Sequence, residues 1–143
     1  MLDLAAVGRS DVVYDLGCGD GRIVIAAAKR GARGVCVEID RLRIAEARRN
    51  ARQAGVEDRI EFYVDDLFEH PIGSATVVML FLTSDMNLRL RPKLLRELKP
   101  ATRIVAHMYR IGDWPPAKSA TAPGPLREHP IFLWLAGTPP VKR

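Results

Sequence analysis

The sequence predicts a doubly wound α/β fold with a mostly parallel sheet, formed by residues 1–143 as one domain. Three observations lead to this prediction. Short apolar runs alternate with helix-like segments at the spacing of strand–helix–strand units. The run 75–82 contains almost no polar residue, as expected for a strand covered on both faces of a sheet. A glycine-rich turn follows the first run, where sheets of this kind bind ligands.

The first half of the chain contains two predicted strand–helix pairs. The apolar run 12–14 leads into the glycines, and the helical pattern of residues 23–30 follows them. Residues 34–39 are predicted to form a second buried strand. Asp40 is placed to cap the next helix, which ends at Gly55.

The second half of the chain completes the predicted sheet. A helix is predicted for residues 89–98, with Pro92 at the start of a new first turn. Residues 112–125, which are rich in glycine and proline, are predicted to form a loop tract. The remaining predicted strands cover residues 60–64, 75–82, 102–107 and 131–135.

The composition indicates a soluble, basic globular protein. The chain has no basic leader and no apolar run of the ~20 residues that a membrane span requires, so we expect a cytoplasmic protein without a membrane partner. The formal net charge of +5 comes mostly from arginines spread along the chain. We interpret them as a solvated surface. The alternative, an RNA-binding surface, lacks aromatic residues that interleave the basic stretches and could stack on bases.

The glycine turn has a spacing and a charge that favour a cationic ligand. Its glycines are Gly17, Gly19 and Gly21, with Asp15 before the first and Asp20 before the third. A pyrophosphate would meet like charge here, whereas the sulfonium and ammonium of S-adenosylmethionine would be attracted. A nicotinamide-dependent oxidoreductase is the disfavoured alternative, because the turn lacks the G-x-G-x-x-G spacing.

Polar and apolar residues after the next strands extend the predicted cofactor site. Glu38 can accept two hydrogen bonds from a ribose diol, although a nicotinamide nucleotide would use it equally well. Asp66 suits the adenine amino group, and Ile39 and Leu67 offer apolar contact to the ring. For Asp20 two interpretations are equally supported: it shapes the loop, or it contacts the ligand. The full predicted set is Asp15, Gly17, Cys18, Gly19, Asp20, Glu38, Ile39, Asp66, Leu67 and Phe81.

The two cysteines, Cys18 and Cys36, are predicted to be free thiols. A disulfide would constrain the very turn that has to approach a ligand, and disulfides are rare in cytoplasmic proteins.

Three segments together resemble the class I, or seven-strand, S-adenosylmethionine-dependent methyltransferases. Residues 13–25 look like the first motif of that family, residues 37–40 resemble its acidic second motif, and residues 65–67 resemble its adenine-side motif. The resemblance covers about residues 11–114. It implies a Rossmann-like methyltransferase sheet and cofactor contact by Asp15, Gly17, Gly19, Glu38 and Asp66.

Within that family, residues 19–29 together with Trp114 are similar to a group of short enzymes that includes mitochondrial protein-lysine N-methyltransferases. The chain departs from the usual pattern in two places. Only about ten residues precede Asp11, which implies a truncated N-terminal helical segment. Residues 81–85 stand where enzymes that methylate base or glutamine amines carry an Asn-Pro-Pro-Tyr-like motif.

We therefore predict an N-methyltransferase that acts on a protein lysine or a related amine. Methyl transfer needs no protein nucleophile, but an amine acceptor must lose a proton. By position, the candidate catalytic residues are Asp85 after the fourth strand and His107 or Tyr109 at the end of the fifth. His70 and His129, each before a proline, are predicted to be loop residues. No metal is predicted, because His, Cys, Asp and Glu lack metal-ligand spacing.

Two alternatives stay open at this point. The acceptor could be a small molecule within the same enzyme class. The chain could also be a cofactor-binding module without its own acceptor site, whose uncovered pocket a partner or a second copy in a homodimer would close.

Overall fold

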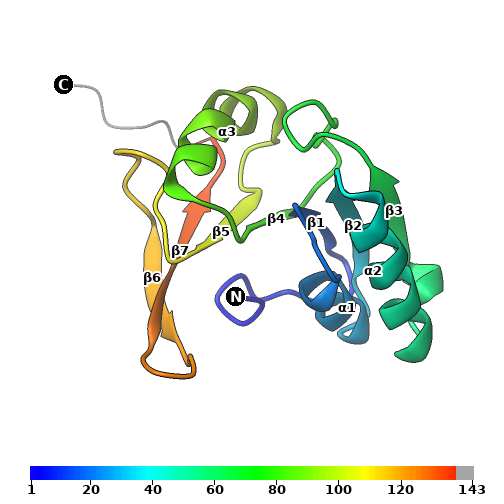
Figure 1. Ribbon diagram of the computed structural model, residues 1–143. Coiled ribbons are helices and arrows are strands. Elements are labelled where there is room, and N and C mark those ends of the chain that lie inside the picture. The colour runs from blue at the N-terminus through cyan, green and yellow to red at the C-terminus, as the bar shows by residue number, and fades with distance from the viewer. Residues whose placement is uncertain (138–143) are drawn as a thin grey trace.

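The computed structural model describes residues 1–137 and contains, within that range, one seven-stranded sheet with strand order β3-β2-β1-β4-β5-β7-β6 (Figure 1). β1 to β5 run parallel to one another, and β7 runs antiparallel to both β5 and β6. The prediction of a doubly wound, mostly parallel α/β fold is confirmed. The strands are β1 (Val12–Leu16), β2 (Arg33–Glu38), β3 (Ile60–Val64), β4 (Val77–Leu80), β5 (Arg103–His107), β6 (Lys118–Ala122) and β7 (His129–Leu135).

Three α-helices and one 3₁₀ turn connect the strands in the described part of the chain. They are α1 (Arg22–Lys29), α2 (Arg41–Gln53), α3 (Ser84–Glu97) and η1 (Glu57–Arg59). The predicted cap of α2 is confirmed, since the Asp40 side chain accepts a hydrogen bond from the Leu42 amide at 2.9 Å. None of these helices is long and apolar enough to cross a membrane.

The helices cover the two faces of the sheet unequally. On one face, α3 packs through Leu90 and Leu94 against buried strand residues that include Val78 and Ile104. On the opposite face lie α1, α2 and the segment before β1, as Figure 1 shows. That first segment forms turns and contains no helix, and its buried Ala5 and Val7 pack against the sheet.

Two elements differ from the sequence-based prediction. The tract 112–125, predicted to be a loop, contains β6, an edge strand that is exposed along nearly all its length and so lacks the apolar run by which strands are recognised. α3 begins at Ser84 instead of residue 89, because Thr83 caps it by accepting from the Met86 amide at 3.2 Å. Pro92 therefore lies inside the helix and not in a first turn. The carbonyl that loses its partner belongs to Leu88, which is exposed to solvent.

Candidate functional site

The predicted site residues meet at the carboxyl edge, by which we mean the edge of the sheet where β1 to β5 end. Because these strands are parallel, the glycine turn after β1 lies beside Glu38 at the end of β2. The segments that follow β3, β4 and β5 reach the same edge. This is where doubly wound sheets bind their ligands.

The glycine turn is shaped by backbone angles and contacts that exclude side chains. Gly17, Gly19 and Gly21 have φ values of 81°, 56° and 84°, in the left-handed region that glycine adopts without strain. The amides of Gly17 and Cys18 donate to the Val37 carbonyl at 2.7 and 3.2 Å. A Cβ atom on Gly17 would lie 3.1 Å from Leu82 Cδ2. The turn is thus held close against β2, and its three glycines place no side chain of their own over the backbone.

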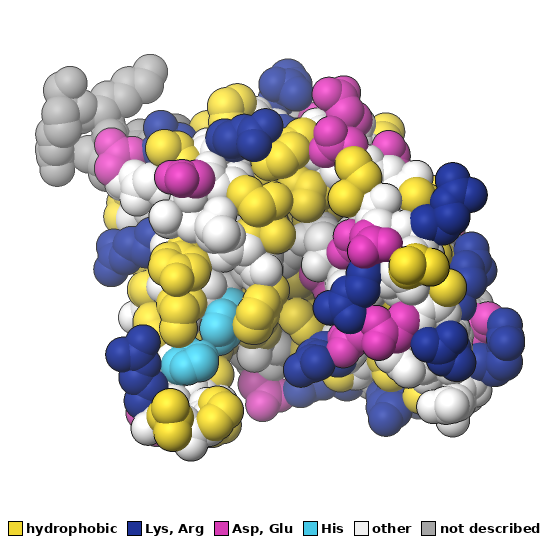
Figure 2. Space-filling model, in the orientation of Figure 1, with side chains coloured by type: hydrophobic (Ala, Val, Ile, Leu, Met, Phe, Trp, Pro, Cys, Tyr) yellow, Lys and Arg dark blue, Asp and Glu magenta, His cyan; other side chains and the backbone are white. Residues whose placement is uncertain are grey.

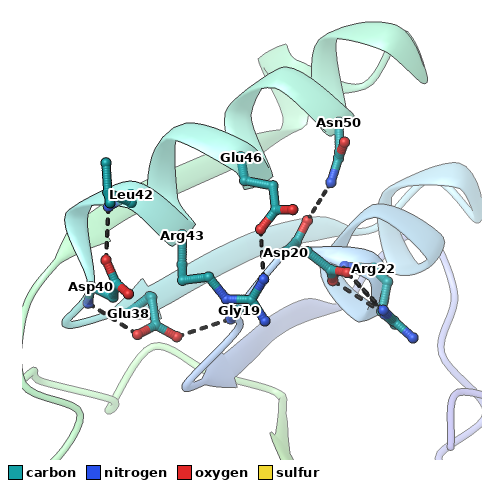
Figure 3. A network of polar contacts seen from close by, with 9 residues as sticks. All are labelled: Gly19, Asp20, Arg22, Glu38, Asp40, Leu42, Arg43, Glu46 and Asn50. Atoms are coloured by element: carbon teal, nitrogen blue, oxygen red, sulfur yellow. Dashed lines mark hydrogen bonds and ion pairs between the residues drawn. The ribbon is translucent and has the colours of Figure 1, made fainter.

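Glu38 joins the glycine turn to the start of α2. Its Oε1 accepts from the Gly19 amide and its Oε2 from the Asp40 amide, both at 3.0 Å (Figure 3). An ionised carboxylate has about four acceptor positions, so each oxygen can accept a further hydrogen bond from a ligand hydroxyl. The predicted contact to a ribose diol is compatible with this geometry and stays a prediction.

Asp15, at the end of β1, is a buried carboxyl group without adequate partners. Its side chain is 1% exposed, and among the described residues its Oδ1 has no hydrogen-bond partner. Burial, followed by repulsion from Glu38 and Asp20, raises the pKa of Asp15 to about 7. A positively charged group bound beside it would relieve this cost. The orphaned oxygen and the open glycine backbone together fit the amino group and carboxylate of S-adenosylmethionine.

The acidic residues of the glycine turn have different partners. The Asp20 carboxylate binds the Arg22 guanidinium at 2.7 Å and also accepts from the Arg22 amide at 3.1 Å, and the Arg22 hydrogen bond is the main reason that the pKa of Asp20 is lowered. In Figure 3 the Asp20 carbonyl accepts from Asn50. Asp20 therefore has a structural role in the loop, which leaves Asp15 and Glu38 as the carboxylates that can attract a cation.

The prediction of two free thiols is wrong, because Cys18 and Cys36 form a disulfide in the structure. The turn folds back along β2, so the Cα atoms of the two residues are 5.4 Å apart and both side chains are buried between α1, α2 and the sheet. The Cys18 side chain is thus committed to holding the loop. The prediction that Cys18 contacts the cofactor stays a prediction, and it would involve the backbone of this residue.

The adenine side of the predicted site is formed by the turn after β3. Asp66 Oδ1 accepts from the Phe68 amide at 2.8 Å, which shapes this turn. Leu67 Cδ2 would lie 3.5 Å from a Cβ on Gly17, so its side chain contacts the glycine turn as an adenine-ring neighbour should. Ile39 is 69% exposed and thereby available to a ligand. Asp65, paired with His70 at 2.8 Å, stays outside the predicted site.

At the other end of the carboxyl edge, an aromatic cluster follows β4 and β5. The Phe81 and His107 rings stack with their centroids 4.0 Å apart and their planes at 12°. His107 Nε2 lies 3.1 Å from Nδ1 of His129. On the face shown in Figure 2, two neighbouring histidine side chains lie beside hydrophobic side chains. His129, predicted to be a loop residue, is in fact the first residue of β7.

The other two candidate catalytic residues lie close to this cluster in the chain but are less constrained. Asp85 is in the first turn of α3 and exposed, and Tyr109, two residues past β5, is 43% exposed. The structure also adds a residue that the sequence did not suggest. Buried Asn87 donates from Nδ2 to the Tyr109 carbonyl at 3.1 Å and so ties α3 to the loop after β5.

Comparisons with known proteins point to one family. The family model of the ANTKMT methyltransferase domain matches residues 15–118. A protein-lysine N-methyltransferase from Saccharolobus islandicus is 43% identical over 139 residues, which are 96% of this chain and 86% of that protein. The adenine nucleotide translocase lysine N-methyltransferase of Mus musculus is 32% identical over 110 residues, which are 76% of this chain and 48% of that protein. The chain thus spans about half the length of the mouse relative.

A solved structure agrees with this match. The crystal structure of an RNA methyltransferase from Salinibacter ruber, in complex with S-adenosyl-L-homocysteine, has 45% sequence identity to this chain and a TM-score of 0.92. The similarity covers 99% of this chain and 91% of that chain.

Proposed function

Because this chain belongs to the family of the ANTKMT methyltransferase domain, we propose that its methyl acceptor is the side-chain amine of a protein lysine. The chain is an enzyme of the S-adenosylmethionine-dependent methyltransferases and uses that cofactor. The acceptor class rests on the Saccharolobus relative, which is named for lysine methylation and matches almost the whole chain.

The cofactor half of the proposed mechanism uses the glycine turn, Asp15 and Glu38. S-Adenosylmethionine, when bound, supplies a methyl group attached to a positively charged sulfur. The sulfur is a good leaving group. Asp15 provides negative charge in a buried position, and the two oxygens of Glu38 provide acceptors next to the Gly19 amide. The chain thereby orients the methyl group, and orientation can supply much of the rate in such a displacement.

The acceptor half of the proposed mechanism uses His107. A lysine ammonium has no lone pair and must lose a proton before its nitrogen can attack. When S-adenosylmethionine is bound, it would supply the methyl group to that nitrogen, and the electron pair of the carbon–sulfur bond would stay on sulfur. His107 lies at the carboxyl edge, and burial, His129 and the Met1 amino group lower the pKa of its imidazole. A neutral imidazole can accept the proton and release it to water.

Asp85 and Tyr109 have a different place in this proposal. Both are exposed beside the aromatic cluster, and neither side chain is fixed by a hydrogen bond within the described residues. We infer that they contact the incoming substrate protein, with Asp85 attracting the cationic lysine. His107, which is stacked and hydrogen bonded, is the better candidate for proton transfer.

The proposal is tested by following the transferred methyl group. The protein is incubated with S-adenosylmethionine that carries a labelled methyl group and with an extract of cellular protein and RNA. Label that survives nuclease and is found by mass spectrometry on lysine supports the proposal. The Glu38→Ala variant, which should bind the cofactor poorly, is the control for label that arises without enzyme action.

The same experiment separates the alternatives. The Salinibacter relative is an RNA methyltransferase, and this chain has a net charge of +5, so label released by nuclease would replace lysine with RNA as the acceptor. Label in small molecules would point to a metabolite. Binding of S-adenosylhomocysteine in a calorimeter, without any transfer, would favour a cofactor-binding module that lacks its own acceptor site.

A further inference from the structure

His107 and His129 form an imidazole pair across two antiparallel strands. In the register of β5 and β7, His107 lies opposite Ile131, so His129 is two residues further on the same face of the sheet. The Met108 amide donates to the Pro130 carbonyl at 2.8 Å and holds the start of β7 beside the end of β5. The two ring centroids are 5.1 Å apart and the ring planes meet at 67°.

Each ring of the pair is also held from another side. Phe81 stacks on the face of His107. Behind His129 lies Gly124 in the turn between β6 and β7, where an added Cβ would be 2.9 Å from His129 Nε2. Phe81 and the turn that contains Gly124 therefore flank the two rings on the sides away from their mutual contact.

The contact decides which nitrogen of His107 can act. In a hydrogen bond between two neutral imidazoles, one nitrogen donates and the other accepts. For His107 Nδ1 to take a proton, Nε2 must already carry hydrogen, and Nδ1 of His129 is then its acceptor. Among the described residues, the hydrogen bond of the His107 ring is made by Nε2, and none is made by Nδ1. Nδ1 is therefore the nitrogen of His107 that remains available to a substrate.

We propose that His129 is a positioning residue that holds His107 in the Nε2–H tautomer, with Nδ1 directed to the lysine amine. This inference rests on the proposed role of His107 in lysine methylation. His129 itself touches neither the amine nor the methyl group in this scheme. It acts through the ring of His107, as a residue that orients a histidine general base does in many enzymes.

The first test reads the tautomer without any activity. The ¹⁵N shifts of histidine-labelled protein distinguish Nε2–H from Nδ1–H imidazole. We expect Nε2–H for His107 in the wild type and a mixture of tautomers in His129→Leu. An Nδ1–H ring in the wild type, or an unchanged spectrum in the variant, would overturn the proposal. Phe81 and His129 contact the His107 ring, and the charge of the Met1 amino group also acts on it.

The second test measures kinetics with the lysine acceptor. His129→Leu should lower kcat by about tenfold, with the affinity for S-adenosylhomocysteine unchanged. His129→Asn, whose Oδ1 can occupy the place of Nδ1 and accept the hydrogen bond, should recover most of the rate. The double variant His107→Ala/His129→Leu should lose no more than His107→Ala alone, because His129 acts only through His107.

The outcomes separate this inference from the function on which it rests. Wild-type protein that fails to methylate lysine would refute the proposed function, while the tautomer test would still apply. Lysine methylation at wild-type rate in His129→Leu, or additive losses in the double variant, would refute the role of His129 alone. If His129→Leu does not fold, the wild-type tautomer and the rate of His129→Asn still decide the matter.

Discussion

Replacing Asp15 with asparagine should stabilise the cofactor-free protein above about pH 7 and remove part of the pH dependence of its stability. The buried carboxyl has its pKa raised from 3.8 to about 7. Between these values the folded protein holds a proton that the unfolded chain has lost, so stability falls as the pH rises from about 4 to 7 and stays constant above. Each pH unit of separation between the two pKa values corresponds to about 1.4 kcal/mol. The full loss for Asp15 is therefore about 4 kcal/mol.

The Asp15→Asn variant has no such loss, but it buries an amide group. An unpartnered buried amide costs roughly 1–3 kcal/mol at every pH, so the variant should be less stable than wild type near pH 4 and more stable near pH 8. From pH 4 to pH 8 the difference in stability between variant and wild type should change by about 4 kcal/mol. The cost of the amide drops out of this change because it is the same at both pH values. Urea unfolding at a series of pH values measures it. If the free energy of unfolding changes with pH in the same way in the variant and the wild type, the reasoning is refuted.

Two further measurements sharpen the Asp15 experiment. Asp11 supplies a control of opposite sign. Its burial favours a raised pKa, but hydrogen bonds from Gly8, Thr76 and Arg103 outweigh burial and lower it, so its stabilisation is lost as the pH falls. Cofactor binding should also release a proton near pH 7, because a ligand ammonium favours ionised Asp15. Calorimetry of S-adenosylhomocysteine in buffers of different ionisation enthalpy would show this release in wild type and not in Asp15→Asn.

Three more predictions follow from contacts in the cofactor half of the site. Glu38→Ala should weaken S-adenosylhomocysteine binding by about 2 kcal/mol, or roughly 30-fold, in calorimetry; unchanged affinity would remove Glu38 from the site. Gly17→Ala should lower both stability and that affinity. Gly55→Ala, at a similar φ of 74° but with no atom within 4 Å of the added Cβ, should cost about 1–2 kcal/mol of backbone strain and leave binding intact. Reducing agent should lower stability to unfolding by about 3 kcal/mol in wild type and not in the Cys18→Ser/Cys36→Ser variant, since the disulfide closes a separation of 18 residues.

Local sequence patterns were sufficient for the elements that are buried on both faces or capped by a nearby side chain. The apolar run around β4 and the cap at Asp40 are examples, because burial and capping act within a few residues. β6 could not be found in this way. Its exposed residues carry no apolar signal, and only pairing with β7 makes it a strand. The predicted helix began at residue 89, although Thr83 is a favourable cap and the structure begins α3 directly after it.

In the candidate site, too, some features can be predicted from local sequence and others depend on distant contacts. Glycine spacing and strand ends predict which segments meet at the carboxyl edge, since a parallel sheet brings them together. The disulfide requires knowing that the glycine turn folds back along β2, and the partner of His107 requires the register of an antiparallel pair. Both are contacts between residues far apart in the chain. A histidine before a proline at a strand start gives no local sign of such a partner.

The reversal of β7 has a consequence for how this enzyme can change. Because β7 runs against its neighbours, its first residue and the turn before it lie where the other strands finish. The turn between β6 and β7 can therefore be lengthened without altering β1 and β2, whose ends form the proposed cofactor site. We therefore expect changes in this turn to alter which substrate is accepted while the proposed methyl-donor site stays unchanged.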